Sequence, residues 1–111
     1  MNMDGLSTLE FFGMGNWQEA GLMVIENGSI LGGNNNHYMK GKYSLSGEVC
    51  IITMECKFVG TPVSMFRVKD NKTKVEIKGI PKDNIIEGTL HRLDIQGLDM
   101  PAKLIKRAEI S

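Results

Sequence analysis

Apolar and polar residues alternate one by one along most of this sequence, and no stretch of ten residues sustains helical spacing. In the run Val49–Phe58, every second residue from Cys50 onward is apolar, whereas Glu55 and Lys57 fall on the opposite side. A period of two is the pattern of a strand that has one face in a core and one in solvent. The chain is therefore predicted to be all-β.

Turn signals separate these alternating runs. Asn27-Gly28 is the strongest short hairpin signal, and the cluster Gly32–Asn36 tolerates the positive φ angles of a sharp corner. Ser46-Gly47 and Pro81–Asn84 break the chain in the same way. The runs expected as strands are 6–12, 20–26, 29–31, 38–45, 49–58, 73–79, a run around 86–91, and 101–108.

About eight antiparallel strands at regular spacing predict an up-and-down barrel that encloses side chains or one small ligand. Closure also removes the exposed sheet edges that invite aggregation. A two-sheet sandwich has the same pattern and stays an alternative. The stretch Val59–Phe66 is the least regular and is compatible with one short helical turn.

The chain of 111 residues is expected to be one domain, residues 1–111. Its 13 basic and 13 acidic residues cancel, so no strong field attracts it to nucleic acid or an anionic membrane. The basic residues from Arg67 to Lys82 are interrupted by Asp70, Glu76 and Asp83, without an aromatic platform among them. Without an apparent signal peptide or an apolar run of membrane-spanning length, a cytoplasmic location is expected.

The alternation predicts which side chains face the barrel interior. We also expect Leu45 to point inward, at the end of its run. These interior residues could fill the barrel or line a site for a small apolar ligand. They are Phe11, Met39, Tyr43, Ile52, Met54, Val75, Ile77 and Leu90.

No catalytic constellation is visible, and neither a metal nor another cofactor is expected. His37 and His91 are predicted to be solvated surface imidazoles, since no ligand spacing connects them to a cysteine or carboxylate. Cys50 and Cys56 would lie on one face of a strand, roughly 20 Å apart, and are expected to be buried free thiols. Trp17, beside a predicted loop, is either an exposed contact site or packs over the barrel mouth.

Six segments in this order resemble the GrlR-like family of small bacterial proteins, which is named for a negative regulator of type III secretion. The resemblance covers nearly the whole chain and is most specific in the hairpin that ends in Gly32-Gly33 and the strand after it. The segments are Met3–Phe11 (MDGLSTLEF), Gly21–Gly33 (GLMVIENGSILGG), Tyr38–Tyr43 (YMKGKY), Lys78–Pro81 (KGIP), Ile85–Thr89 (IIEGT) and Lys103–Arg107 (KLIKR).

The resemblance implies a lipocalin-like barrel in the cytoplasm, a homodimer, and restraint of a transcription activator by protein contact. The regulator-type member has a cluster of acidic residues in the turn before the long strand, whereas here Ser46-Gly47-Glu48 has one acid. We therefore predict a non-enzymatic regulatory or adaptor protein that binds a protein partner, with Trp17 and this turn as candidate contacts. The alternative is a carrier or sensor of a small apolar ligand.

Overall fold

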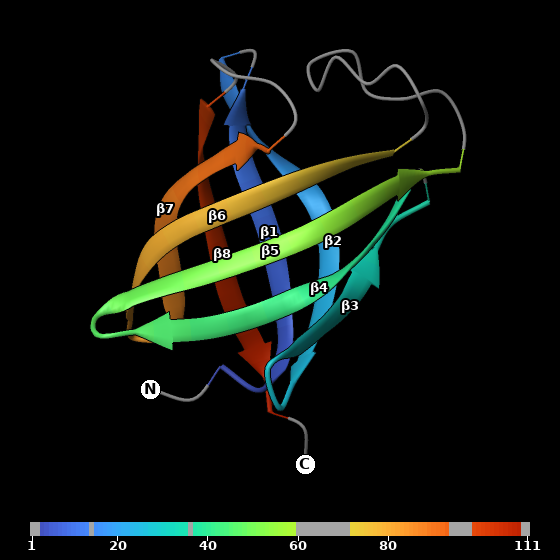
Figure 1. Cartoon of the computed structure of the whole chain (residues 1–111). Coiled ribbons are helices and arrows are strands. Elements are labelled where there is room, and N and C mark those ends of the chain that lie inside the picture. Colours follow the sequence, from blue (N-terminus) through green and yellow to red (C-terminus); the bar gives the residue numbers. More distant parts are fainter. Residues whose placement is uncertain (1–2, 14, 36, 60–71, 94–98, 110–111) are drawn as a thin grey trace.

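The computed structural model describes residues 3–13, 15–35, 37–59, 72–93 and 99–109. These residues form eight strands that close into one barrel (Figure 1). The strands are β1 (Gly5–Gly13), β2 (Asn16–Glu26), β3 (Ser29–Gly33), β4 (His37–Ser46), β5 (Val49–Phe58), β6 (Lys72–Lys82), β7 (Ile85–Arg92) and β8 (Asp99–Ala108).

Each strand pairs antiparallel with the next, and β1 closes the barrel against β8, with Leu9 opposite Leu104. The predicted eight-stranded antiparallel barrel is confirmed. The sandwich alternative is wrong, because one continuous ladder returns to its first strand. Apart from Val59, the predicted helical turn at 59–66 lies outside the described residues.

The turns follow the residues that favour them. Asn27 and Gly28 both have positive φ, 51° and 82°, as the two-residue hairpin between β2 and β3 requires. Asp83 and Asn84 do the same between β6 and β7, with φ of 52° and 68°. These two turns lie at the same end of the barrel as the chain termini, while the β1–β2 and β3–β4 turns lie at the opposite end (Figure 1).

Strand β2 is longer than predicted and contains a bulge. It begins at Asn16 rather than Ala20, so Trp17, predicted beside a loop, is itself a strand residue. Leu9 pairs with Gly21 and the next residue of β1 pairs with Glu19, which leaves Ala20 as an extra residue. A bulge of this kind bends the strand and releases backbone groups from the ladder.

The core is the inside of the barrel. The predicted interior residues Phe11, Met39, Ile52, Met54, Val75, Ile77 and Leu90 are all buried. Tyr43 is only partly buried and packs against this core. Met3 precedes β1 and is buried too.

Leu45 is a correction to the expected inward face, because it is exposed. Its strand loses a neighbour before it reaches Leu45: the ladder between β3 and β4 ends where Ser29 meets Lys42. Residues 44–46 of β4 therefore pair with β5 alone. Leu45 is on the inward side of its strand, but the barrel is no longer closed around it at this height.

Candidate functional site

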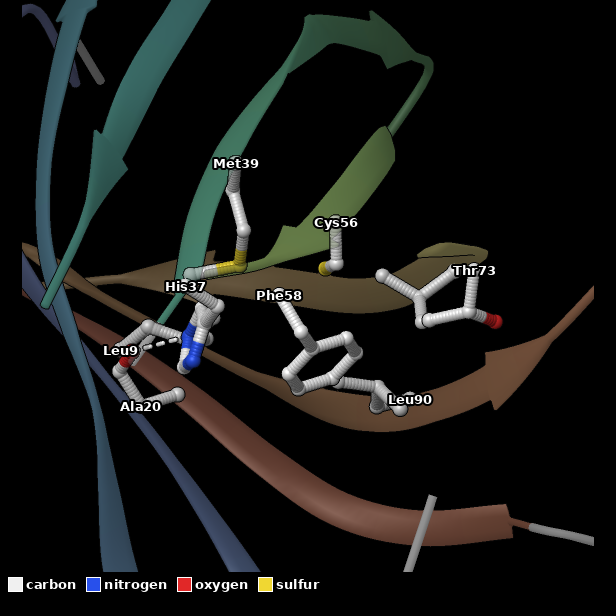
Figure 2. Close-up of a pocket in the computed structure, with 9 residues that line it drawn as sticks. Leu9, Ala20, His37, Met39, Cys56, Phe58, Thr73 and Leu90 are labelled. Atoms are coloured by element: carbon white, nitrogen blue, oxygen red, sulfur yellow. Dashed lines mark hydrogen bonds between the residues drawn. The ribbon is translucent and has the colours of Figure 1, made fainter. Parts of the chain in front are cut away.

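A small cavity lies inside the barrel, near the end that holds the β3–β4 turn (Figure 2). It leaves about 10 Å³ for the centre of a water-sized sphere, which is room for about one water molecule. The lining is mostly apolar, with one imidazole and one hydroxyl. Its residues are Leu9, Ala20, His37, Met39, Cys56, Phe58, Thr73, Val75 and Leu90.

His37 is not the solvated surface residue that the sequence predicts. Its side chain is buried, and its ring lies 5.5 Å from that of Phe58, measured between centroids. The ring Nε2 donates a hydrogen bond of 2.8 Å to the carbonyl of Ala20, the bulged residue of β2 (Figure 2). The bulge thus leaves the Ala20 carbonyl free to accept a hydrogen bond, and the imidazole of His37 on β4 donates it.

The turn before β4 fixes the position of His37. Asn34 Oδ1 accepts the His37 backbone N–H at 3.2 Å, and the Asn34 backbone N–H donates to the His37 carbonyl at 2.9 Å. The Asn34 side-chain amide also donates to the Ala20 carbonyl, at 3.3 Å. Asn34 and Asn35 are exposed, as the asparagine-rich corner predicts, and Asn34 also holds the buried His37 in place.

Burial lowers the pKa of His37 below its ordinary value of 6.5, and the bond to Ala20 offsets only part of this effect. The imidazole is neutral at neutral pH, with its proton on Nε2. Nδ1 then has a lone pair, and among the described residues it has no hydrogen-bond partner. A neutral imidazole with one fixed nitrogen is suited to positioning the β3–β4 turn.

The two cysteines are free and buried, as predicted. Burial raises the pKa of Cys50 to about 11 and that of Cys56 to about 12. Because the thiolate is the nucleophile, neither cysteine is activated at neutral pH. Cys56 lines the cavity near His37 but does not form an activated thiol–imidazole pair.

Trp17 lies on the outside of the barrel, with 44% of its surface exposed. Phe12 is its partner across the β1–β2 ladder, and the two rings meet edge to face with centroids 5.6 Å apart. Lys103 of β8 places its Nζ 4.2 Å from the centre of the Trp17 ring. A cation at this distance over an indole is attracted by the ring face. Trp17 is therefore exposed but held in place from two sides.

Two ion pairs connect β1 to β8 beside this aromatic pair. Glu10 of β1 lies 3.7 Å from Lys103 and 3.9 Å from Arg107, both on β8. A shallow depression runs from Trp17 past Lys103 to Thr89 and Pro101. We call Phe12, Trp17, Thr89, Pro101 and Lys103 together the Trp17 surface.

The turn Ser46-Gly47-Glu48 is exposed, and Gly47 has a φ of 64° with open space around it. The flanking residues Leu45 and Val49 are exposed as well. This turn joins β4 to β5, so it lies at the opposite end of the barrel from Trp17 (Figure 1). The structure does not bring the two predicted partner contacts together.

Within the described part of the chain, no three His, Cys, Asp or Glu side chains gather in a way that could hold a metal ion. His91 is separate from His37 and lies 3.2 Å from Glu76 on the outer face. The same residues also include no helix long and apolar enough to cross a membrane.

A comparison of the chain with known family models and with curated proteins finds no match. The resemblance to the GrlR-like family therefore stays a prediction.

The sequence predicts a contact role for Trp17 but not for its neighbours Phe12, Lys103 and Pro101. These residues meet only through the register of β1 with β2 and β8. A signal existed in the β1–β2 hairpin, since Phe12 and Trp17 flank the glycine-rich turn symmetrically.

Proposed function

We propose that this chain is a non-enzymatic regulatory or adaptor protein of the bacterial cytoplasm that acts by binding a protein partner. By its GrlR-like resemblance, the partner is a transcription activator that the protein restrains. The observation that supports this proposal most is the Trp17 surface, an exposed and preorganised aromatic pair beside a cation on an otherwise closed barrel.

The Trp17 surface has the composition of an interface hot spot. Tryptophan is enriched at such positions because it buries a large area and loses little side-chain entropy when it binds. Phe12 and Lys103 already fix the indole in the free protein, so less ordering remains to oppose association. Pro101 extends the apolar surface beside Trp17, and the hydroxyl of Thr89 adds a hydrogen-bonding group next to it.

The interior offers less to a ligand than the outside does. The cavity near His37 holds about one water molecule, so a lipid-sized ligand would have to displace several packed core side chains. The carrier alternative is therefore the weaker candidate. Within the described chain, the buried thiols and the neutral His37 give no activated nucleophile, which favours binding over catalysis.

The test uses Trp17 as its own reporter, because it is the one tryptophan of the chain. Helix-turn-helix activators of the host are purified singly, as variants without tryptophan, and titrated against the protein while Trp17 fluorescence is followed. We expect one activator to shift the emission and to bind Trp17→Ala at least about 30-fold more weakly, as for a hot-spot residue. Binding to Trp17→Ala is measured by calorimetry, since this variant lacks the fluorophore.

Two matched variants locate the contact. Ile80→Ala removes a side chain that is 61% exposed on β6 and should bind as the unchanged protein does. Glu48→Ala tests the β4–β5 turn. If Glu48→Ala weakens binding while Trp17→Ala does not, the partner contacts the β4–β5 turn and not the Trp17 surface. A small molecule that co-purifies in stoichiometric amount, with no activator bound, would overturn the proposal itself.

A further inference from the structure

Four apolar side chains are neighbours on the outside of β2, β3 and β4, which lie side by side (Figure 1). Leu22 and Val24 on β2, Leu31 on β3 and Tyr38 on β4 are exposed by 48%, 45%, 61% and 48%. We call these four residues the apolar face. Leu22 and Tyr38 flank Gly33, and in the next row Val24 lies directly opposite Leu31. Exposed apolar side chains in one contiguous group mark a contact surface more often than the same number scattered singly.

The margin of the apolar face on the β4 side is basic. Lys40 and Lys42 follow Tyr38 on the outward side of β4, and Lys57 on β5 is the ladder partner of Tyr38. These three lysines are exposed and form no ion pair with another described residue. Glu55 is the only acidic residue paired with one of them in the described ladders. Three lysines and one glutamate leave two positive charges in excess at this margin.

The backbone under the apolar face cannot accept an added strand. At the positions of the face, β2, β3 and β4 each pair with a neighbour on both sides, so their N–H and C=O groups are used in the ladders. A segment that lies on this face must therefore satisfy its own backbone groups, as an α-helix does. The width also fits a helix. Two strand spacings separate β2 from β4 by about 10 Å, and a helix with its side chains is about 10–12 Å wide.

The lysines define the charge pattern of such a helix. Lys40 and Lys42 are two residues apart on one strand, so their Cα atoms are separated by about 7 Å. Two acidic residues four positions apart lie on one side of a helix, about 6 Å apart along its axis. Glu26 is exposed at the margin on the β2 side and disfavours acidic residues there. The expected helix is therefore acidic along one flank only.

We propose that the apolar face and its basic margin bind one amphipathic helix of a partner protein. The apolar stripe of the helix covers Leu22, Leu31 and Tyr38, and an acidic flank faces Lys40 and Lys42. This inference goes beyond the proposed function, because it assigns a second contact surface. Trp17 is roughly 15 Å from Leu22 along β2 and packs toward β8.

The apolar face favours a protein helix over a nucleic acid. Phosphate groups would contact the lysines and leave Leu22, Val24 and Leu31 in water. Proteins that bind single strands stack successive bases on several aromatic side chains. Of the described residues on the outward side of β4, β5 and β6, Tyr38 is the only aromatic one.

The first experiment titrates a designed helix of about 18 residues, labelled with fluorescein, and follows its anisotropy. Leucines at i, i+3, i+4 and i+7 form its apolar stripe, and glutamates four positions apart form one flank. This glutamate helix should bind with a Kd of about 10 to 100 μM. A lysine helix, with lysine in place of each glutamate, should bind at least about tenfold more weakly. No saturable binding, or equal binding of the two helices, would overturn the proposal.

Matched variants locate the contact. Leu31→Asp and Ile80→Asp each add one carboxylate at a residue that is 61% exposed. Leu31→Asp should weaken binding of the glutamate helix at least about tenfold, as at the centre of an interface. Ile80→Asp should bind it within about twofold of the unchanged chain, because β6 is outside the apolar face. Equal effects of the two changes would mean that the helix binds elsewhere.

A charge exchange tests the acidic flank. The double variant with Lys40→Glu and Lys42→Glu should bind the lysine helix more tightly than the glutamate helix, which reverses the original preference. An unreversed preference would mean that these lysines do not face the flank. Trp17→Ala should bind the glutamate helix normally, so failure of this surface is distinguishable from failure of the partner site.

Two further probes test the other classes of anionic ligand. They are a fluorescein-labelled strand of about 12 thymidines and vesicles that contain phosphatidylglycerol, both at about 0.15 M salt. We expect neither to bind as tightly as the glutamate helix. Tighter binding of the oligonucleotide or of the vesicles would overturn the proposal and assign the lysines to a nucleic acid or to a membrane.

Discussion

His37 shows how one side chain can connect two strands through a single backbone acceptor. Its Nε2 binds the Ala20 carbonyl, which the bulge in β2 frees from the ladder, and Asn34 supports both groups. The neighbouring asparagines predict a surface position for His37. The hydrogen bond from the Asn34 side chain to the Ala20 carbonyl depends on the bulge, and the bulge lies in a run, Ala20–Ile25, that is apolar on both faces.

The stability of the protein should depend on the protonation of His37. Its folded-state pKa is lowered by burial, so the unfolded chain takes up a proton at about 6.5 while the folded chain does not. The free energy of unfolding should therefore be highest above pH 6.5 and decrease as the pH falls below it. In His37→Gln this dependence should be smaller, because glutamine keeps an N–H donor but does not titrate.

Urea denaturation at pH 7.5 and pH 5.0 checks this prediction. Other groups titrate in both proteins, so the difference between the two pH dependences is the readout. Equal pH dependences for His37→Gln and the unchanged chain would show that the imidazole titrates alike in the folded and unfolded states.

The cysteines make a second prediction at this scale. With pKa values near 11 and 12, Cys50 and Cys56 are thiols at neutral pH and are also shielded from reagents. An aromatic disulfide reagent at pH 7.5 should therefore modify the native protein at least about 100-fold more slowly than the chain in urea, where two thiols react. Rapid modification of one thiol in the native protein would mean that its strand opens locally.

At the scale of elements, turn chemistry was the reliable part of the sequence. Asn27-Gly28 predicted its hairpin, and the alternation predicted the bounds of β5 without error. The errors arose where the alternation along a strand does not determine whether a side chain is buried. Ala20 and Gly21 are consecutive and both buried because of the bulge, while Leu45 is exposed because β3 ends before it. Such features depend on which strands are neighbours, which a single sequence does not state.

Glycine substitutions in β2 and its turn test the bulge. Gly21 has a φ of 137°, and a Cβ there would lie 2.4 Å from the Gly33 carbonyl oxygen. Gly21→Ala should lower the free energy of unfolding by about 3 kcal/mol or more, from backbone strain together with a steric clash. Gly15 has a φ of 83° and open space around it, so Gly15→Ala should cost only about 1 kcal/mol.

Urea midpoints at neutral pH measure both glycine variants. The contrast between them isolates the close approach of β2 and β3, because both positions have a positive φ. Similar decreases in the free energy of unfolding for the two variants would mean that β3 moves aside without cost and that Gly33 does not hold the bulge in place.

At the scale of the whole molecule, the fold was predictable, whereas the site was predictable only in part. Eight alternating runs with tight turns have few closed solutions, and the up-and-down barrel is one of them. The Trp17 surface is different, because its residues come from four strands, β1, β2, β7 and β8. Its composition is determined by register, and one extra residue at Ala20 shifts the pairing of β2 relative to β1.

The packed interior leads to the last prediction, on what the barrel can hold. The cavity has room for about one water molecule, so native mass spectrometry of freshly purified protein should show no stoichiometric apolar adduct. Leu90→Ala removes a buried side chain from the cavity wall and should lower the free energy of unfolding by about 3 kcal/mol. If it folds, its enlarged cavity should retain benzene-sized compounds that the unchanged chain does not bind. A lipid-sized adduct on the unchanged chain would mean that the core side chains rearrange around a ligand, and the carrier function would then take precedence over partner binding.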